Sequence, residues 1–155
     1  MVPARNYNDL YMVHIEGGNM SLLQLIYASH LCADESVLPS IHSHAVRNDT
    51  EHVLSGMLLY ANRRFLQVIE AERKDVLHTF SYIQQDARHD QVHVLSEKEI
   101  PEKTFKHWNM GFRHLEKYDL LAHPEFAAYL TSPFEQMKAN PGTALEMLKA
   151  YSPVV

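Results

Sequence analysis

The sequence VLSGMLLYANRRFLQVIE, residues 53–70, contains two apolar runs separated by a short polar turn. Val53–Tyr60 and Arg64–Glu70 are rich in the aliphatic and aromatic residues that strands favour, and Ala61-Asn62-Arg63 joins them. Two runs of this length with a three-residue connection predict an antiparallel hairpin.

The segments on either side of this hairpin give the remaining elements. Leu22–Ser29 (LLQLIYAS) is apolar on both faces, which is the pattern of a central strand. Helix-start residues at 34–36 introduce a helix over 36–48. After the hairpin, the patterns predict a helix over Glu72–Gln85, strands over Val92–Ile100 and Phe105–His114, and two short helices over 123–131 and 143–151.

The resulting order is β-α-β-β-α-β, followed by one additional strand and two C-terminal helices. This order predicts a ferredoxin-like α+β fold, in which helices lie on one face of a mostly antiparallel sheet. Three parts are expected: an N-terminal extension over 1–20, a sheet domain over 21–114 and a helical cap over 115–155. Met20 directly precedes the first strand and is a candidate natural start, so a non-native origin of 1–20 stays open.

Composition narrows the class of protein. With 155 residues, 46% of them hydrophobic, and only 5 Gly and 7 Pro, the chain is neither disordered nor collagen-like. No apolar run approaches the roughly 18 residues that a membrane span needs. The single cysteine, Cys32, cannot form an internal disulfide, which is typical of a reducing cytosol. The cysteine content therefore predicts a cytoplasmic protein. A formal net charge of −5 argues against direct nucleic-acid binding.

Two polar residues lie on strand faces that are expected to be buried. Side chains alternate along a strand, so Gln67 shares a face with Phe65 and Ile69, and Tyr27 lies on an equivalent face of the first strand. Each has a plain structural interpretation, because a buried amide or phenol needs only hydrogen-bond partners in the core. Together they place a proton-donating phenol and an amide with donor and acceptor ends on one sheet.

Other candidate residues have a structural and a functional interpretation. Trp108, Met110 and Phe112 share a face of the last predicted strand, where they either pack in the core or line the same pocket. The polar run 47–50 (RNDT) is either a helix end or an edge that hydrogen-bonds a planar heterocycle, and the same alternatives hold for 86–89. His42 and His44 are two residues apart on a helix and diverge, so no metal site is expected.

Five segments in matching order and spacing resemble the BLUF family, which senses blue light with FAD. The resemblance covers 21–112 and rests on QLIYAS (24–29), RND and LSGMLLY within 47–60, RRFLQVIEAE (63–72), IQQDARH (83–89) and HWNMGF (107–112). It implies one FAD held between the two sheet-covering helices, with the flavin ring over the sheet.

The resemblance also implies roles for single residues. Tyr27 matches the electron and proton donor, and Gln67 matches the glutamine whose hydrogen bonds to the flavin rearrange after light absorption. Trp108 and Met110 match the pair that carries the signal outward. The positions that match cofactor contacts are Tyr27, Ile41, Arg47, Asn48, Asp49, Gln67, Ile83, Asp86, Arg88 and His89.

The chain departs from the family at Asp49, where the family usually has Asn. A carboxylate accepts a hydrogen bond from the flavin N3–H, but it has no N–H to give to a carbonyl. It also places negative charge beside the cofactor unless a cation such as Arg47 is close. Asn48, the neighbouring residue, could supply part of the missing contact. A lesser departure is Ala71, where the family usually has Gly.

The leading hypothesis is a short blue-light photoreceptor that is not itself an enzyme. The helical cap over 115–155 is too short for an output enzyme, so a separate protein partner is expected, together with a homo-oligomer. The alternative is a BLUF-derived interaction module that has weak or lost flavin binding because of Asp49. A small hydrolase of the acylphosphatase type is disfavoured, because the acidic stretch after the first strand cannot form its anion-binding loop.

Overall fold

The computed structural model describes residues 21–52, 54–106 and 110–152, with 47–52 described only as helical backbone. Its elements over the sheet domain are β1 (Leu22–Leu31), the short 3-10 helix η1 (Glu35–Val37), α2 (Leu38–His52), β2 (Ser55–Ala61), β3 (Arg64–Glu72), α3 (Arg73–Gln85), β4 (His89–Ile100) and β5 (Gly111–His114). The helices of the C-terminal part are α4 (Lys117–Ala122), α5 (Pro124–Leu130), α6 (Phe134–Ala139) and α7 (Pro141–Ala150). The predicted N-terminal extension, 1–20, lies outside the described residues.

The five strands form one sheet in the order β4-β1-β3-β2-β5. β1 pairs with β3 and β4, and β2 pairs with β3, all antiparallel, whereas β5 joins the edge parallel to β2. The predicted ferredoxin-like α+β fold with an additional strand is therefore confirmed. The turn between β2 and β3 is a tight hairpin, in which Asn62 and Arg63 adopt positive φ angles of 51° and 66°.

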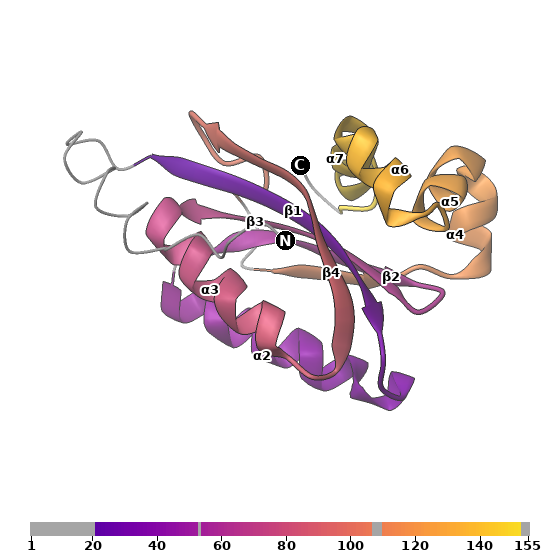
Figure 1. Ribbon diagram of the computed structural model, residues 1–155, viewed down its shortest axis with the longest axis horizontal. Helices are drawn as coiled ribbons and strands as arrows, with labels where there is room; N and C mark the ends of the chain where they lie inside the picture. The colour runs from indigo at the N-terminus through magenta and orange to yellow at the C-terminus, as the bar shows by residue number, and fades with distance from the viewer. Residues whose placement is uncertain (1–20, 53, 107–109, 153–155) are drawn as a thin grey trace.

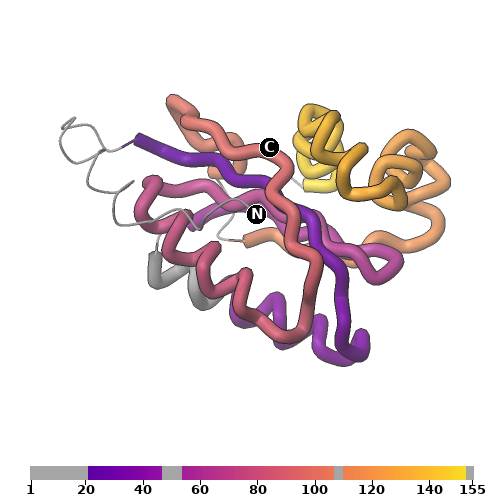
Figure 2. Tube along the Cα trace, viewed as in Figure 1, coloured from indigo at the N-terminus to yellow at the C-terminus, as the bar shows by residue number. Residues whose placement is uncertain are grey.

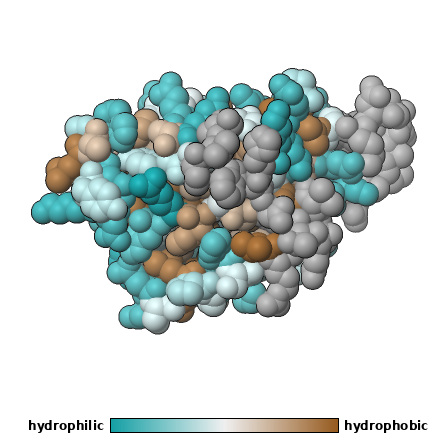
Figure 3. Space-filling model, turned by 180° about the vertical axis from the view of Figure 1, so that it is seen from behind, coloured by the Kyte–Doolittle hydropathy of each residue, from teal (hydrophilic) through white to brown (hydrophobic). Residues whose placement is uncertain are grey.

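Helices cover both faces of the sheet, as Figure 1 and the Cα trace in Figure 2 show. α2 and α3 cover one face, over a core that includes Leu25, Ile69 and Phe80. The C-terminal helices cover the other face, over a core that includes Leu66 and Val68. The expectation of helices on one face was incomplete, because the central strands are apolar on both faces and both need a cover. Seen from behind, the described surface is mostly hydrophilic, with hydrophobic residues gathered toward the centre (Figure 3).

Two sequence predictions for the C-terminal half need correction. The strand predicted over Phe105–His114 is confirmed only for Gly111–His114. Residues 105 and 106 form a bend and a turn, and 107–109 lie outside the described residues. Four short helices form the described cap, whereas two were predicted. α5 and α7 overlap the predicted 123–131 and 143–151, and α4 and α6 were not predicted. α4 and α6 have six residues each, too few for a helical period to stand out. Among the described helices, none has the length and apolar character to cross a membrane.

Glu70 explains why the chain turns before β5. This carboxylate is fully buried, and it lies on the face of β3 opposite Gln67. Its Oε1 accepts hydrogen bonds from the backbone N–H groups of Thr104 and Phe105, each 2.8 Å long. Its Oε2 accepts a third bond from the Gln24 amide, also 2.8 Å long. These bonds stabilise the buried charge and fix the segment that leads to Met110 and β5.

Replacing Glu70 by Gln tests this anchor. An amide cannot accept at both positions, so at least one buried donor loses its partner, and the free energy of unfolding should fall by about 2 kcal/mol. Urea unfolding of Glu70→Gln measures the loss. Glu146→Gln, at an exposed position on α7, is the matched control and should leave stability unchanged. Equal stability of the two variants would contradict the anchoring role.

Candidate functional site

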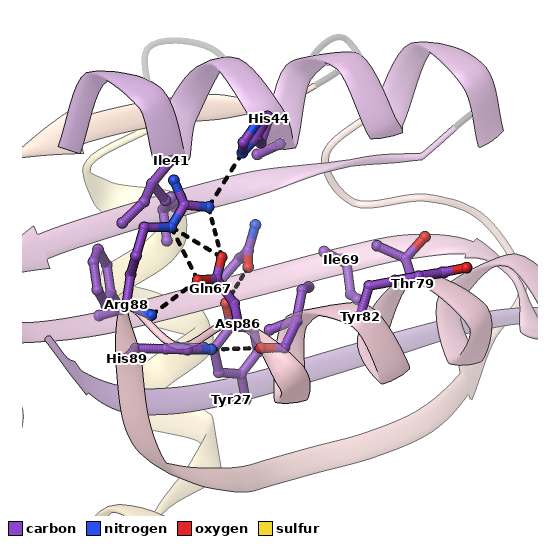
Figure 4. Close-up of a pocket in the computed structure, with 14 residues that line it drawn as sticks. Tyr27, Ile41, His44, Gln67, Ile69, Thr79, Tyr82, Asp86, Arg88 and His89 are labelled. Atoms are coloured by element: carbon purple, nitrogen blue, oxygen red, sulfur yellow. Dashed lines mark hydrogen bonds and ion pairs between the residues drawn. The ribbon is translucent and has the colours of Figure 1, made fainter. Parts of the chain in front are cut away.

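A cavity of about 150 Å³ lies between α2, α3 and the sheet. Figure 4 shows that its side chains come from both helices, from the central strands and from the connection between α3 and β4. The lining residues are Tyr27, Ile41, His44, Ala45, Leu58, Phe65, Gln67, Ile69, Thr79, Tyr82, Ile83, Asp86, Arg88 and His89. The resemblance to BLUF proteins predicts the cofactor ring in this region, between the two helices and the sheet.

Tyr27 and Gln67 lie directly opposite each other on the paired strands β1 and β3. Both are buried, with exposed fractions of 4% and 3%. The Tyr27 hydroxyl donates a hydrogen bond to the Gln67 Oε1 atom, and the Gln67 Nε2 atom donates to the Met110 sulfur at 3.3 Å. The structure thus joins three predicted site residues in one chain of contacts, with the amide at its centre.

Burial also sets the protonation of the phenol. The pKa of Tyr27 is raised far above its usual value of about 10, chiefly because burial disfavours the phenolate and secondarily because Asp86 is negatively charged. The phenol therefore keeps its proton at neutral pH. It can donate that proton only to a partner that becomes a much stronger base, or if the ring loses an electron.

Asp86 and Arg88 form an ion pair at one end of the cavity. The Arg88 Nη2 atom lies 2.6 Å from Asp86 Oδ2, and the other guanidinium contacts reach α2, at Ser40 Oγ (2.9 Å) and His44 Nδ1 (3.2 Å). Arg88 lowers the pKa of Asp86 by hydrogen bonding, and Asp86 raises the pKa of Arg88. Both groups stay charged at neutral pH, and the arginine connects the α3–β4 connection to α2 (Figure 4).

His89 has both ring nitrogens bonded within the protein. Nε2 lies 2.5 Å from the Ile83 carbonyl oxygen, which only accepts, so this nitrogen carries a proton. Nδ1 lies 2.8 Å from Ser29 Oγ. The ring packs edge-on against Tyr27 and Phe65, with centroids 6.3 Å away in each case. The imidazole is therefore held in place, and its contribution to a ligand is its ring surface.

Apolar side chains from the two helices face the same cavity. Ile41 from α2 and Ile83 from α3 are half-buried. Sequence reasoning missed several lining residues, among them Thr79 and Tyr82 on α3. The signal for Thr79 was a polar residue within the buried stripe of Val76, Leu77 and Phe80.

Several predicted site residues lie outside the described part of the chain. These are Trp108 and the side chains of Arg47, Asn48 and Asp49. Within the described residues, no group of three or more His, Cys, Asp or Glu side chains is arranged to hold a metal ion. Cys32 is exposed and free.

Comparison with known proteins identifies the family of the chain. The model of the BLUF family, described as sensors of blue-light using FAD, matches residues 22–111. The photoactivated adenylate cyclase subunit alpha of Euglena gracilis is 30% identical over 120 residues, which cover 74% of this chain and 12% of that protein. Subunit beta from the same organism is 28% identical over 114 residues, covering 71% of this chain and 13% of that protein. The chain thus spans about an eighth of the length of these curated relatives.

Solved structures share the fold. The ground state of BlsA has a TM-score of 0.69 at 23% identity, covering 86% of this chain and 94% of BlsA. The dark state of BlrB, described as a BLUF protein, has a TM-score of 0.63 at 24% identity, covering 83% of this chain and 99% of BlrB. From the match over 22–111, together with the fold, the chain belongs to the BLUF family of blue-light sensors.

Proposed function

We propose that this protein is a blue-light photoreceptor that binds FAD between α2 and α3 and signals to a separate protein partner. The observation that carries the proposal is the buried contact chain from Tyr27 through Gln67 to Met110, beside a cavity closed by both helices. The FAD form of the cofactor is taken from the family description, and the residue roles follow the resemblance in sequence.

The residues around the cavity fit a flavin. Ile41 and Ile83 come from opposite helices and would contact the two faces of a flat, apolar ring system. Arg88 and Asp86 offer charged hydrogen-bonding groups at one end, and Gln67 beside them offers both a donor and an acceptor (Figure 4). When bound, the flavin supplies blue-light absorption and, once excited, a strong one-electron oxidant.

Tyr27 is suited to give an electron and a proton together. Its raised pKa keeps the phenol protonated until an electron leaves the ring, and its hydrogen bond to Gln67 gives the proton a path. When the electron and the proton return, the redox state of the protein is unchanged. The lasting difference then lies in the hydrogen bonds of Gln67.

The hydrogen bonds of Gln67 can differ before and after electron transfer because one end of its amide accepts and the other donates. In the structure its carbonyl faces Tyr27 and its amino group faces the Met110 sulfur. In a rotated or tautomeric amide, the hydrogen-bond donor and acceptor at these two positions change places. The Met110 thioether sulfur is a weak acceptor and has no proton to donate, so it cannot bond a carbonyl oxygen in place of the N–H. The contact with Met110 therefore changes together with the contact to Tyr27.

A change at Met110 has a short route to the C-terminal helices. Met110 directly precedes β5, and Arg113 on β5 forms an ion pair of 2.7 Å with Asp119 on α4. The Tyr151 hydroxyl, just after α7, donates to the Asp119 carbonyl at 2.9 Å. We therefore propose β5 and the cap as the output surface, acting on a cytoplasmic partner or within a homo-oligomer. In this proposal the chain itself is not an enzyme and binds no nucleic acid directly.

The second candidate is a BLUF-derived interaction module that binds flavin weakly or not at all. Asp49 favours it, because a carboxylate in place of the usual Asn cannot donate a hydrogen bond to a flavin carbonyl. Both candidates share the fold and the output surface. They differ in whether the protein retains FAD.

Tyr27→Phe tests the proposed photochemistry. The variant removes only the hydroxyl, so FAD should stay bound while the reversible red shift of the flavin absorption under blue light disappears. Light-minus-dark absorption spectra measure the shift. Tyr118→Phe, at an exposed position on α4, is the control and should behave like the parent protein. An unchanged photocycle in Tyr27→Phe would remove Tyr27 from its role.

Asp49→Asn distinguishes the two candidates. It restores an N–H donor and removes a negative charge, so FAD should bind about three- to tenfold more tightly, as one added hydrogen bond predicts. Fluorescence titration of the apoprotein with FAD measures the change. Asp90→Asn, at an exposed aspartate that is hydrogen-bonded to His30, is the charge-matched control. If affinity does not increase beyond that of the control, Asp49 is not the weak point.

A further inference from the structure

Two exposed side chains belong to the lining of the cavity. Of its 14 lining residues, His44 on α2 and Tyr82 on α3 are exposed, whereas the other 12 are buried or half-buried. Tyr82 is 60% exposed, and it is one of three exposed large hydrophobic side chains among the described residues. The part of the lining that faces solvent thus consists of one side chain from each of the two helices.

The Tyr82 ring has a defined orientation at the rim of the cavity. It packs edge-on against the His78 ring, four residues earlier on the same helix, with centroids 5.1 Å apart. Figure 4 shows Tyr82 beside Thr79, at the end of the cavity away from Arg88. An aromatic ring that is oriented by one neighbour and is still largely open to solvent can stack with a second flat ring.

His44, the other exposed lining residue, already has a partner within the protein. Its Nδ1 atom accepts a hydrogen bond of 3.2 Å from Arg88 Nη2, and Arg88 also pairs with Asp86. These contacts hold His44 at the polar end of the cavity. At the opposite end, the exposed lining surface is the Tyr82 ring.

The size and charge of the cavity decide which part of FAD reaches this rim. At about 150 Å³, the cavity is smaller than the roughly 300–1,000 Å³ of pockets that enclose a drug-sized ligand. Among the described lining residues, one is an arginine, Arg88, and it is paired with Asp86. A diphosphate buried here would lack a compensating charge, which is unfavourable. With the flavin ring inside, the diphosphate and the adenosine therefore extend outward, past the exposed residues.

We propose that Tyr82 stacks with the adenine of FAD, and that this contact makes the protein prefer FAD to FMN, which lacks the adenosine. The inference rests on the proposed function, because it takes a flavin as the ligand. The ribityl diphosphate chain of FAD is flexible, so the adenine can fold back onto α3. Stacking on an aromatic side chain needs no specific hydrogen bonds, because every base has a π-face. The cavity then binds the flavin ring, and its rim binds the adenine.

Tyr82→Ala separates the contributions of the two parts of the cofactor. The dissociation constant for FAD should increase about five- to tenfold, in the lower part of the range for base–aromatic stacking because the rim is open to solvent. The dissociation constant for FMN should stay within about twofold of that of the parent protein, because FMN has no adenine to lose contact. Calorimetric titration of the apoprotein with each flavin measures both constants.

Two further variants make the outcome decisive. Tyr82→Phe keeps the ring and should bind FAD within about twofold of the parent protein, while Tyr118→Ala, at an exposed tyrosine on α4, should change neither constant. Equal losses of FAD and FMN affinity in Tyr82→Ala would overturn the inference, and so would an unchanged affinity for FAD. If neither flavin binds to the parent protein or to Asp49→Asn, the proposed function itself fails, and this inference fails with it.

Discussion

The hydrogen bond between Tyr27 and Gln67 is the interaction on which the site depends. It exists because β1 and β3 pair in the register that sets these two residues opposite each other. A buried amide also needs a partner for its other end, and Met110, directly before the edge strand β5, supplies one. A shift of one residue in this register would turn Tyr27 to the opposite face and expose a polar side chain to the second core.

β3 carries a polar residue toward each layer of the molecule. Gln67 serves the cavity under α2 and α3, whereas Glu70, on the other face, holds the backbone of Thr104 and Phe105. The same strand thus lines the candidate site and fixes the segment that leads to Met110. The ion pair from Arg113 to Asp119 continues from β5 into the cap. In the proposed function, a change at Gln67 reaches the cap through these contacts.

The sequence was most informative where periodicity is strong. The two-residue period correctly placed Tyr27 and Gln67 on one buried face, and the order of elements correctly predicted a ferredoxin-like α+β sheet, although not where the additional strand joins it. It failed where bonds between distant residues decide the structure. The strand predicted from Phe105 begins only at Gly111, because the Phe105 backbone N–H donates its hydrogen bond to the Glu70 carboxylate and not to a neighbouring strand. Thr79 was missed as a lining residue because one polar residue within an apolar stripe of a helix does not indicate a cavity by itself. The bonding of His89 to Ser29 and Ile83 depends on contacts that only the folded chain creates.

The central claim is that light changes the hydrogen bonds of Gln67 and leaves the redox state of the protein unchanged. A light-minus-dark infrared difference spectrum of the FAD-loaded protein tests it most directly, because a stronger hydrogen bond lowers the stretching frequency of a carbonyl. The account predicts a reversible downshift of a flavin carbonyl band that disappears in Gln67→Leu. A protein that binds FAD yet shows no carbonyl shift, or the same shift in Gln67→Leu, would contradict it.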